Sequence, residues 1–200
     1  LESVFENTRN FHYEIIVADD GSNDETVRIH EHFENLKLVR HARNTGFVRN
    51  CNAAARSARG SYLLFLNSDT IVQSNWLKHL VETMESDASI GLIGPKFVLP
   101  NGRIQEAGGI IGKNGKSTHF GYYKLSGKPE FNYLKEVDYI SGACVMIRRS
   151  LWEALGGFDE QFSPSYYEDV DLAYQVREKG YRVVYQPAAT VVHFEGISLG

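Results

Sequence analysis

Residues 13–25 read YEIIVADDGSNDE, an apolar run of β type followed at once by an acidic turn. The compact apolar run predicts a buried strand. Ser22 and Glu25 have the spacing of a capping box and predict a helix that runs to about Asn35. The segment therefore has the order strand, polar turn, helix that is typical of an α/β unit.

The same alternation continues after this unit. A strand is predicted over residues 36–39, a helix over about 46–58 and a third, strongly apolar strand over 62–66. This βαβαβ order predicts the α/β class, with a mostly parallel, Rossmann-like sheet flanked by helices. Residues 102–135 instead predict a long, partly irregular excursion, because glycines, lysines and aromatics are interleaved there without a regular period.

The composition is typical of one domain over residues 1–200 and limits its partners. The chain has 21 basic and 25 acidic residues and a net charge of −4, so we expect no nucleic-acid partner. No apolar run reaches the ~18 residues of a transmembrane helix. The two cysteines form no CxxC pair, which favours a cytoplasmic protein. A peripheral position at the inner face of the membrane and the oligomeric state are left open.

The first candidate site is the pair Asp19-Asp20, at the carboxyl end of the first predicted strand. Ligands of open α/β sheets bind at that end of the strands. A carboxylate there can accept hydrogen bonds from a nucleobase N–H or from ribose hydroxyls. The competing interpretation is an Asx turn that caps the next helix, and the pair alone does not separate the two.

The second candidate is Asn67-Ser68-Asp69, which directly follows the most apolar strand. An acidic group there can bind Mg²⁺ or Mn²⁺, which prefer hard oxygen ligands, and so bridge to a diphosphate. The neutral imidazole of His193, at the end of the last predicted strand, can complete this metal site with Asp69. Taken singly, each feature has a structural alternative, an ordinary polar turn and an ordinary packed histidine.

The third candidate is the trio Glu168, Asp169 and Asp171 at the start of a helix predicted over 168–179. The helix dipole alone favours acids in a first turn. Crowded carboxylates also repel one another, and this repulsion can give one of them a pKa suited to a general base. Because Glu168 and Asp171 share a helix face, we expect Asp169 to face a pocket.

The order of the motifs is more specific than any one of them. Along the chain they are Asp19-Asp20-Gly21-Ser22, Asn44-Thr45-Gly46-Phe47, Asn67-Ser68-Asp69-Thr70, Gly156-Gly157-Phe158-Asp159-Glu160, Glu168-Asp169-Val170-Asp171-Leu172 and Val192-His193. In this order they resemble the family 2 glycosyltransferases, and within them the bacterial rhamnosyltransferase-like branch. The resemblance implies the GT-A nucleotide-diphospho-sugar transferase fold. Members normally begin with a central strand of Val-Ser-Ile-Ile-Ile-Pro type, and this N-terminal strand is expected to be missing here.

The resemblance also implies an activity. It is an inverting transfer of a sugar from a nucleotide-diphosphate donor to the hydroxyl of a glycan or lipid-linked acceptor, with Mn²⁺ or Mg²⁺ as cofactor, in bacterial polysaccharide or cell-surface glycan synthesis. Position by position, the resemblance assigns catalysis to Asp169 with Glu168 in support, donor binding to Asp19, Asp20, Asn44, Asn67 and Ser68, and metal binding to Asp69 and His193. Asn67 departs from the DxD motif of the family, which has an acid at this position. We expect acceptor contacts in the excursion 102–135 and at the turn Ser141-Gly142-Ala143.

Two other interpretations are kept. A nucleotidyltransferase of related fold would form a sugar nucleotide, but it usually has a Gly-rich, Arg/Lys-bearing loop after its first strand, and the corresponding turn here is acidic. An inactive nucleotide-sugar binding module stays open because of the missing strand, although the retained acids and His193 argue against it. The stretch Gly112–Ser117 resembles the end of a P-loop, but its glycine spacing is wrong for that motif.

Overall fold

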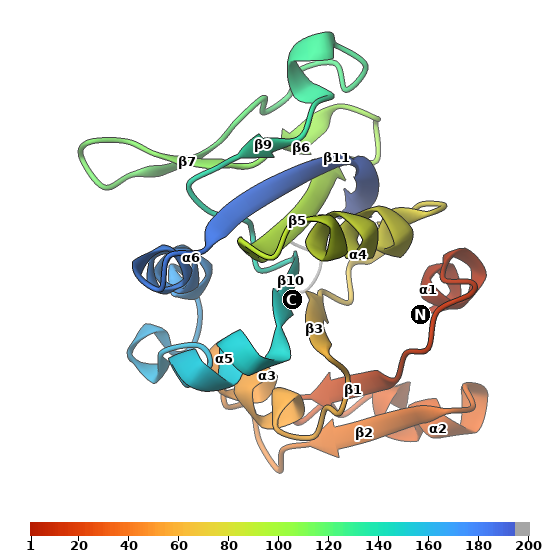
Figure 1. Ribbon diagram of the computed structural model, residues 1–200. Coiled ribbons are helices and arrows are strands. Elements are labelled where there is room, and N and C mark those ends of the chain that lie inside the picture. The colour runs from red at the N-terminus through yellow and green to blue at the C-terminus, as the bar shows by residue number, and fades with distance from the viewer. Residues whose placement is uncertain (195–200) are drawn as a thin grey trace.

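The computed structural model describes residues 1–194 of the chain (Figure 1). Its α-helices are α1 (Glu2–Asn7), α2 (Ile29–His32), α3 (Phe47–Ala55), α4 (Trp76–Ser86), α5 (Arg149–Leu155) and α6 (Glu168–Glu178). Its strands are β1 (Ile15–Asp19), β2 (Leu36–Arg40), β3 (Tyr62–Leu66), β4 (Thr70–Val72), β5 (Ile90–Val98), β6 (Ile104–Glu106), β7 (Gly109–Ile111), β8 (Ser117–His119), β9 (Lys135–Glu136), β10 (Cys144–Arg148) and β11 (Arg182–His193). Short 3₁₀ turns cover Glu25–Arg28, Pro129–Phe131 and Glu160–Phe162.

The largest sheet has mixed strand directions. It has seven strands in the order β3-β10-β5-β11-β4, with β6 beside β5 and β9 beside β11. Strands β5 and β11 are parallel, whereas β10 is antiparallel to both of its neighbours and β11 is antiparallel to β4. The predicted α/β class is confirmed, but the expectation of a mostly parallel sheet is wrong. A parallel neighbour needs a crossover connection, and the path from β5 to β10 contains no α-helix.

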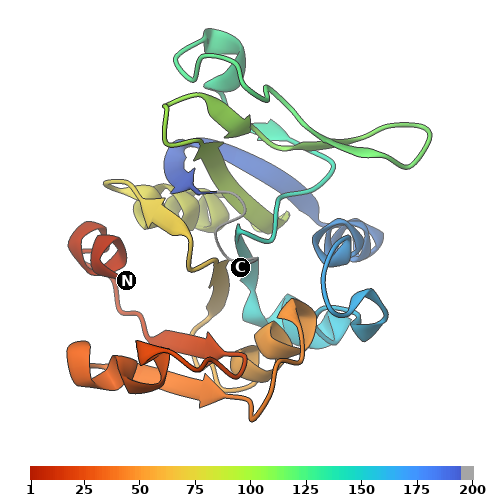
Figure 2. The same cartoon turned by 180° about the vertical axis from the view of Figure 1, so that it is seen from behind.

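Strands β1 and β2 form a separate parallel pair, in register from Ile15 opposite Leu36 to Asp19 opposite Arg40. Figures 1 and 2 show this pair with α2 and α3 at the end of the molecule away from β6, β7 and β9. Within residues 1–194, no ladder joins the pair to the larger sheet, so β1 and β3 are outermost strands of different sheets. The missing central strand stays a prediction.

Helices cover both faces of the larger sheet, and β5 lies between two apolar clusters. All nine of its residues are buried. Ile93 packs in one cluster with Leu80 and Met84 of α4, whereas Leu92 belongs to the other cluster, with Val176 of α6. Successive side chains of a strand point to opposite faces, which explains this division. Burial of each such side chain is worth about 1.5–3 kcal/mol.

The helix predicted over residues 22–35 is shorter than expected. The structure has a 3₁₀ turn followed by α2, and the chain is extended again at Phe33. Asp24, not Ser22, caps the turn, because its Oδ1 accepts the N–H of Thr26 at 2.9 Å. The N–H of Ser22 donates instead to Asp19 Oδ1 at 2.8 Å. This bond belongs to the acidic turn after β1.

Candidate active site

Asp69 and His193 come together at the end of the larger sheet. Their segments are held by the antiparallel pairing of β4 with β11 and by a hydrogen bond from Phe194 N to Asp69 O of 2.9 Å. His193 Nε2 lies 3.3 Å from Asp69 Oδ1, and the two side chains are only 12% and 6% exposed. The structure therefore brings together the two residues that the sequence predicts as metal ligands, although 123 residues separate them.

The hydrogen bonding of this pair is suited to a cation. His193 Nδ1 lies 3.0 Å from Gln105 Oε1, and because that oxygen is an acceptor, Nδ1 is the nitrogen that donates in this contact. His193 Nε2 faces Asp69 Oδ1, a buried oxygen without a hydrogen-bond donor. A proton or a metal ion between these two atoms would satisfy both of them. The described residues contain no group of three His, Cys, Asp or Glu side chains that could hold a metal.

Asn67 and Ser68 form the turn between β3 and Asp69. The N–H of Asn67 donates to Ala143 O at 2.9 Å, and its carbonyl accepts the hydroxyl of Thr70 at 2.6 Å. Ser68 is exposed. The bond to Ala143 joins this turn to the small-residue turn before β10, so the predicted metal ligand and the predicted acceptor turn share one framework. The donor-binding roles of Asn67 and Ser68 stay predictions.

In the acidic turn after β1, Asp20 already accepts hydrogen bonds from the loop that precedes α3. Asp20 Oδ1 accepts from the N–H and the hydroxyl of Thr45 at 2.8 and 2.7 Å, and its Oδ2 accepts from Gly46 N at 2.8 Å. Asn44 Oδ1 lies 3.0 Å from the same Gly46 N. A carboxylate offers about four acceptor positions, so Asp20 keeps capacity for a ligand. In this structure Asp20 and Asn44 orient the loop that begins α3.

Asp19 has a different environment from Asp20. Its side chain is fully buried, with Oδ2 3.1 Å from the Arg40 guanidinium. Asp19 and Arg40 lie directly opposite each other in the β1–β2 register. Asp19 thus closes the end of the strand pair, and its predicted contact with the donor stays untested.

Gly46 requires its glycine because the backbone there has φ +89° and passes close to Pro164. A Cβ at this position would lie 2.6 Å from Pro164 Cα, inside normal contact distance. The loop after β2 is therefore pressed against the segment that leads into α6. This contact brings the Asp20 loop to the side of the molecule that carries Asp169.

Glu168 begins α6 and is 6% exposed. Its Oε2 is buried without a hydrogen-bond partner. Burial raises the pKa of Glu168 to about 7, and the charge of Asp169 beside it acts in the same direction. A carboxyl group in this state is part protonated at neutral pH, so Glu168 can both hold and release a proton.

Asp169 is fixed by two backbone donors. Its Oδ2 accepts from Gly142 N at 3.0 Å and its Oδ1 from Val170 N at 2.8 Å. Burial raises the pKa of Asp169, the two backbone N–H groups act against this rise, and the charge of Glu106 adds to it. The sequence predicted that Asp169 faces a pocket and, separately, that the turn 141–143 contacts the acceptor. The hydrogen bond from Gly142 N joins Asp169 to that turn.

Two residues of β6 belong to this region although no sequence motif indicates them. Gln105 contacts His193, as above, and Glu106 is 1% exposed. Glu106 Oε2 lies 2.5 Å from His119 Nδ1, and its Oε1 accepts from Ser141 N at 3.3 Å. Both residues lie in the excursion predicted as irregular. The sequence there indicates their role by no more than two polar residues that follow Ile104 in a Gly-rich stretch.

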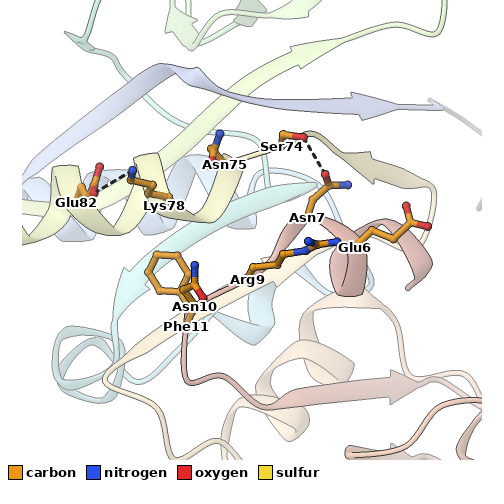
Figure 3. A pocket seen from close by; sticks show the side chains of 9 residues that line it. All are labelled: Glu6, Asn7, Arg9, Asn10, Phe11, Ser74, Asn75, Lys78 and Glu82. Atoms are coloured by element: carbon orange, nitrogen blue, oxygen red, sulfur yellow. Dashed lines mark hydrogen bonds and ion pairs between the residues drawn. The ribbon is translucent and has the colours of Figure 1, made fainter.

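A cavity of about 920 Å³ lies elsewhere, between α1 and the start of α4 (Figure 3). Its walls carry Glu6, Asn7, Arg9, Asn10, Phe11, Ser74, Asn75, Lys78 and Glu82. Two pairs of these side chains bind each other across short distances, Ser74 with Asn7 and Lys78 with Glu82. None of the predicted site residues lines it.

The mixed sheet with helices on both faces has the architecture of the GT-A fold. A crystal structure of GalNAc-T7 with UDP, GalNAc and Mn²⁺ has this fold and matches with a TM-score of 0.79 and 21% identity, over 96% of this chain and 39% of that one. The chain belongs to glycosyl transferase family 2, whose model matches residues 1–156. The resemblance read from the motifs is therefore confirmed.

Two curated relatives are bacterial proteins. The chain is 31% identical to the O-antigen biosynthesis protein RfbC of Myxococcus xanthus over 99% of its own length, but it spans only 16% of that relative. It is 25% identical to the N-acetylglucosaminyl-diphospho-decaprenol L-rhamnosyltransferase of Mycobacterium tuberculosis, over 93% of this chain and 68% of the relative. Among residues 1–194, no helix has both the length and the apolar character needed to cross a membrane.

Proposed function

We propose that this chain transfers a sugar, with inversion, from a nucleotide-diphosphate donor to the hydroxyl of a glycan or lipid-linked acceptor in polysaccharide or cell-surface glycan synthesis. The observation that carries the proposal is the half-buried carboxylate of Asp169, which accepts hydrogen bonds from Gly142 N and Val170 N. The names of the bacterial relatives support the glycan context.

Asp169 is the proposed general base. Its Oδ atoms accept the acceptor hydroxyl proton as that oxygen forms a bond to the anomeric carbon and the bond to the diphosphate breaks. A pKa raised by burial makes the carboxylate a stronger base than an exposed aspartate. Glu168, with a pKa of about 7, is the proposed supporting acid, because its charge state changes the basicity of its neighbour.

Asp69 and His193 are the residues that would hold Mn²⁺ or Mg²⁺. The orphaned Asp69 Oδ1 and the Nε2 of His193 are an oxygen and a nitrogen ligand at the right separation to share one ion. A bound divalent ion neutralises charge that develops on a leaving diphosphate. Gln105 orients the imidazole ring through Nδ1. Asp19, Asp20, Asn44, Asn67 and Ser68 are the proposed donor contacts.

Donor binding is tested by thermal unfolding with UDP-, GDP- and dTDP-sugars, each with Mn²⁺, Mg²⁺ or EDTA. A donor at 100 times its Kd stabilises the protein by about 2.7 kcal/mol, which raises Tm by roughly 5–10 °C for a chain of this size. We expect this rise with one nucleotide, and its loss in EDTA and in Asp69→Ala. The matched control Glu34→Gln removes an exposed carboxylate and keeps the rise.

Transfer is tested with Asp169→Asn, which keeps the shape of the side chain and removes the base. We expect at least a 100-fold loss of kcat with the donor-induced rise in Tm unchanged. Near-normal transfer by this variant would refute the assigned base. Donor binding without any transfer by the wild-type chain would instead favour the inactive nucleotide-sugar binding module, and pyrophosphate release from a nucleotide triphosphate would favour the nucleotidyltransferase.

A further inference from the structure

Glu106 is a buried carboxylate that joins two segments. It is 1% exposed, and its two oxygens contact different partners, Ser141 N at 3.3 Å and His119 Nδ1 at 2.5 Å. His119 ends β8, and its side chain is 41% exposed. A buried carboxylate with both oxygens engaged fixes the distance between the groups that contact it. Glu106 therefore ties the β7–β8 hairpin to the turn before β10.

That turn is the one that holds Asp169. Ser141 N is bound by Glu106, and the next amide, Gly142 N, donates to Asp169 Oδ2 at 3.0 Å. Each peptide group is planar, and the two amides are separated only by the φ and ψ angles of Ser141, so the position of one amide limits the position of the other. A change at Glu106 is therefore expected to reach Asp169 through a single residue.

The hairpin is itself anchored to the segment that leads into the turn. The N–H of Gly109 donates to Tyr139 O at 3.0 Å, and Asp138 N donates to Gly109 O at 3.0 Å. The side chain of Asp138 accepts from Ile111 N at 2.8 Å. Figure 2 shows the hairpin projecting from the body of the molecule, and these bonds, together with Glu106, connect it to the site.

We propose that Glu106 is a positioning residue for Asp169: by binding Ser141 N and His119 together, it holds the turn where Gly142 N meets the base. This inference rests on the proposed function, in which Asp169 is the general base. We assign Glu106 no contact with the donor or the acceptor. It acts through the turn.

The first test measures amide hydrogen exchange by NMR in the wild type, Glu106→Ala and Glu106→Gln. In Glu106→Ala we expect exchange at both Ser141 and Gly142 to be at least tenfold faster. In Glu106→Gln we expect both rates within threefold of the wild type, because an amide can accept from Ser141 N and donate to a neutral His119 Nδ1. The control Glu130→Ala removes an exposed glutamate of the same excursion and leaves both rates unchanged.

This test needs no ligand and no activity. Acceleration confined to Ser141 would overturn the proposal, because the turn would then hold Asp169 without Glu106. Equal defects in Glu106→Ala and Glu106→Gln would overturn it too, because the hydrogen bonds would not be the cause. If Glu106→Ala does not fold, Glu106→Asp replaces it with the same expectation, since the side chain is one methylene too short to reach both partners.

The second test measures transfer with the donor found by thermal unfolding. We expect Glu106→Ala to lower kcat at least tenfold with donor KM within twofold of the wild type, and Glu106→Gln to restore kcat to within threefold. Unchanged kcat in Glu106→Ala would overturn the proposal. Normal transfer by Asp169→Asn would refute the proposed function instead, and the exchange rate of Gly142 would still decide whether Glu106 holds the turn.

Discussion

The pKa of Glu168 predicts how the stability of the fold depends on pH. The group has an ordinary value of 4.5 and a value of about 7 in the folded chain. The folded state therefore binds more protons than the unfolded state between these two values, and its stability falls as pH rises through that window. Glu168→Gln keeps the length of the side chain and cannot ionise, so the stability of the variant does not show this fall with rising pH.

The size of the effect follows from the shift. A shift from 4.5 to about 7 corresponds to about 3 kcal/mol, at about 1.4 kcal/mol for each pKa unit. Glu168→Gln carries a constant cost of its own, because the new amide N–H groups are buried where Oε2 already lacks a partner. That cost does not depend on pH. The free energy of unfolding of the variant minus that of the wild type should therefore rise by about 3 kcal/mol between pH 4.5 and pH 8.

Urea unfolding at half-unit intervals from pH 4.5 to pH 8 measures this difference directly. Ionisable groups that do not interact with Glu168 titrate alike in both proteins and cancel, whereas Asp169 is coupled to Glu168 and titrates differently in the variant. Glu34→Gln, which removes an exposed carboxylate, should track the wild type at every pH. A difference between Glu168→Gln and the wild type that is flat with pH, or that falls as pH rises, would refute the raised pKa and with it the supporting role of Glu168.

Three further outcomes follow from the packing and the hydrogen bonds. Gly94→Ala should lower the free energy of unfolding by about 1–3 kcal/mol, because its Cβ would lie 2.0 Å from Ile140 Cγ2. Gly127→Ala, with open space around it, should leave the free energy of unfolding unchanged, and equal free energies of unfolding for the two variants would contradict this reasoning. Leu80→Ala should cost about 2–5 kcal/mol in the same assay, because Leu80 is fully buried under β5; a cost below 1 kcal/mol would mean that α4 is not packed there. Asp20→Ala should lower Tm and speed amide exchange at Gly46, because three hydrogen bonds to its carboxylate are lost; unchanged exchange would show that the loop holds itself.

The sequence predicted the element types well wherever a regular period is present. The apolar runs at 36–39 and 62–66 are strands, and the helices predicted over about 46–58 and 168–179 are α3 and α6. Strand direction is different, because it depends on the path between strands and not on the residues of the strand. The antiparallel β10 is joined to β5 by a 45-residue path without an α-helix, and no pattern within 144–148 encodes its direction.

The candidate site, too, could be predicted from the sequence only in part. The ordered motifs predicted that Asp69 and His193 share a site, and the structure places them 3.3 Å apart. Glu106 was not predicted, because its importance comes from burial and from two partners that lie 13 and 35 residues away. A glutamate in a Gly-rich stretch is ordinarily exposed, and only the three-dimensional structure reveals this one as buried.

An irregularity in β6 explains how neighbouring residues serve both parts of the site. In the register with β5, Ile104 lies opposite Val98 and Glu106 opposite Phe97, so Gln105 is an extra residue without a partner. Such a bulge redirects a side chain that a regular strand would place on the opposite face from its neighbours. Gln105 is thereby free to contact His193, whose ring also packs on Phe97 with centroids 6.0 Å apart, while Glu106 keeps its place beside Ser141. Deleting Gln105 would remove the contact with His193 and shift Glu106 relative to Ser141, so the proposed metal ligand and the proposed base depend on the same local geometry.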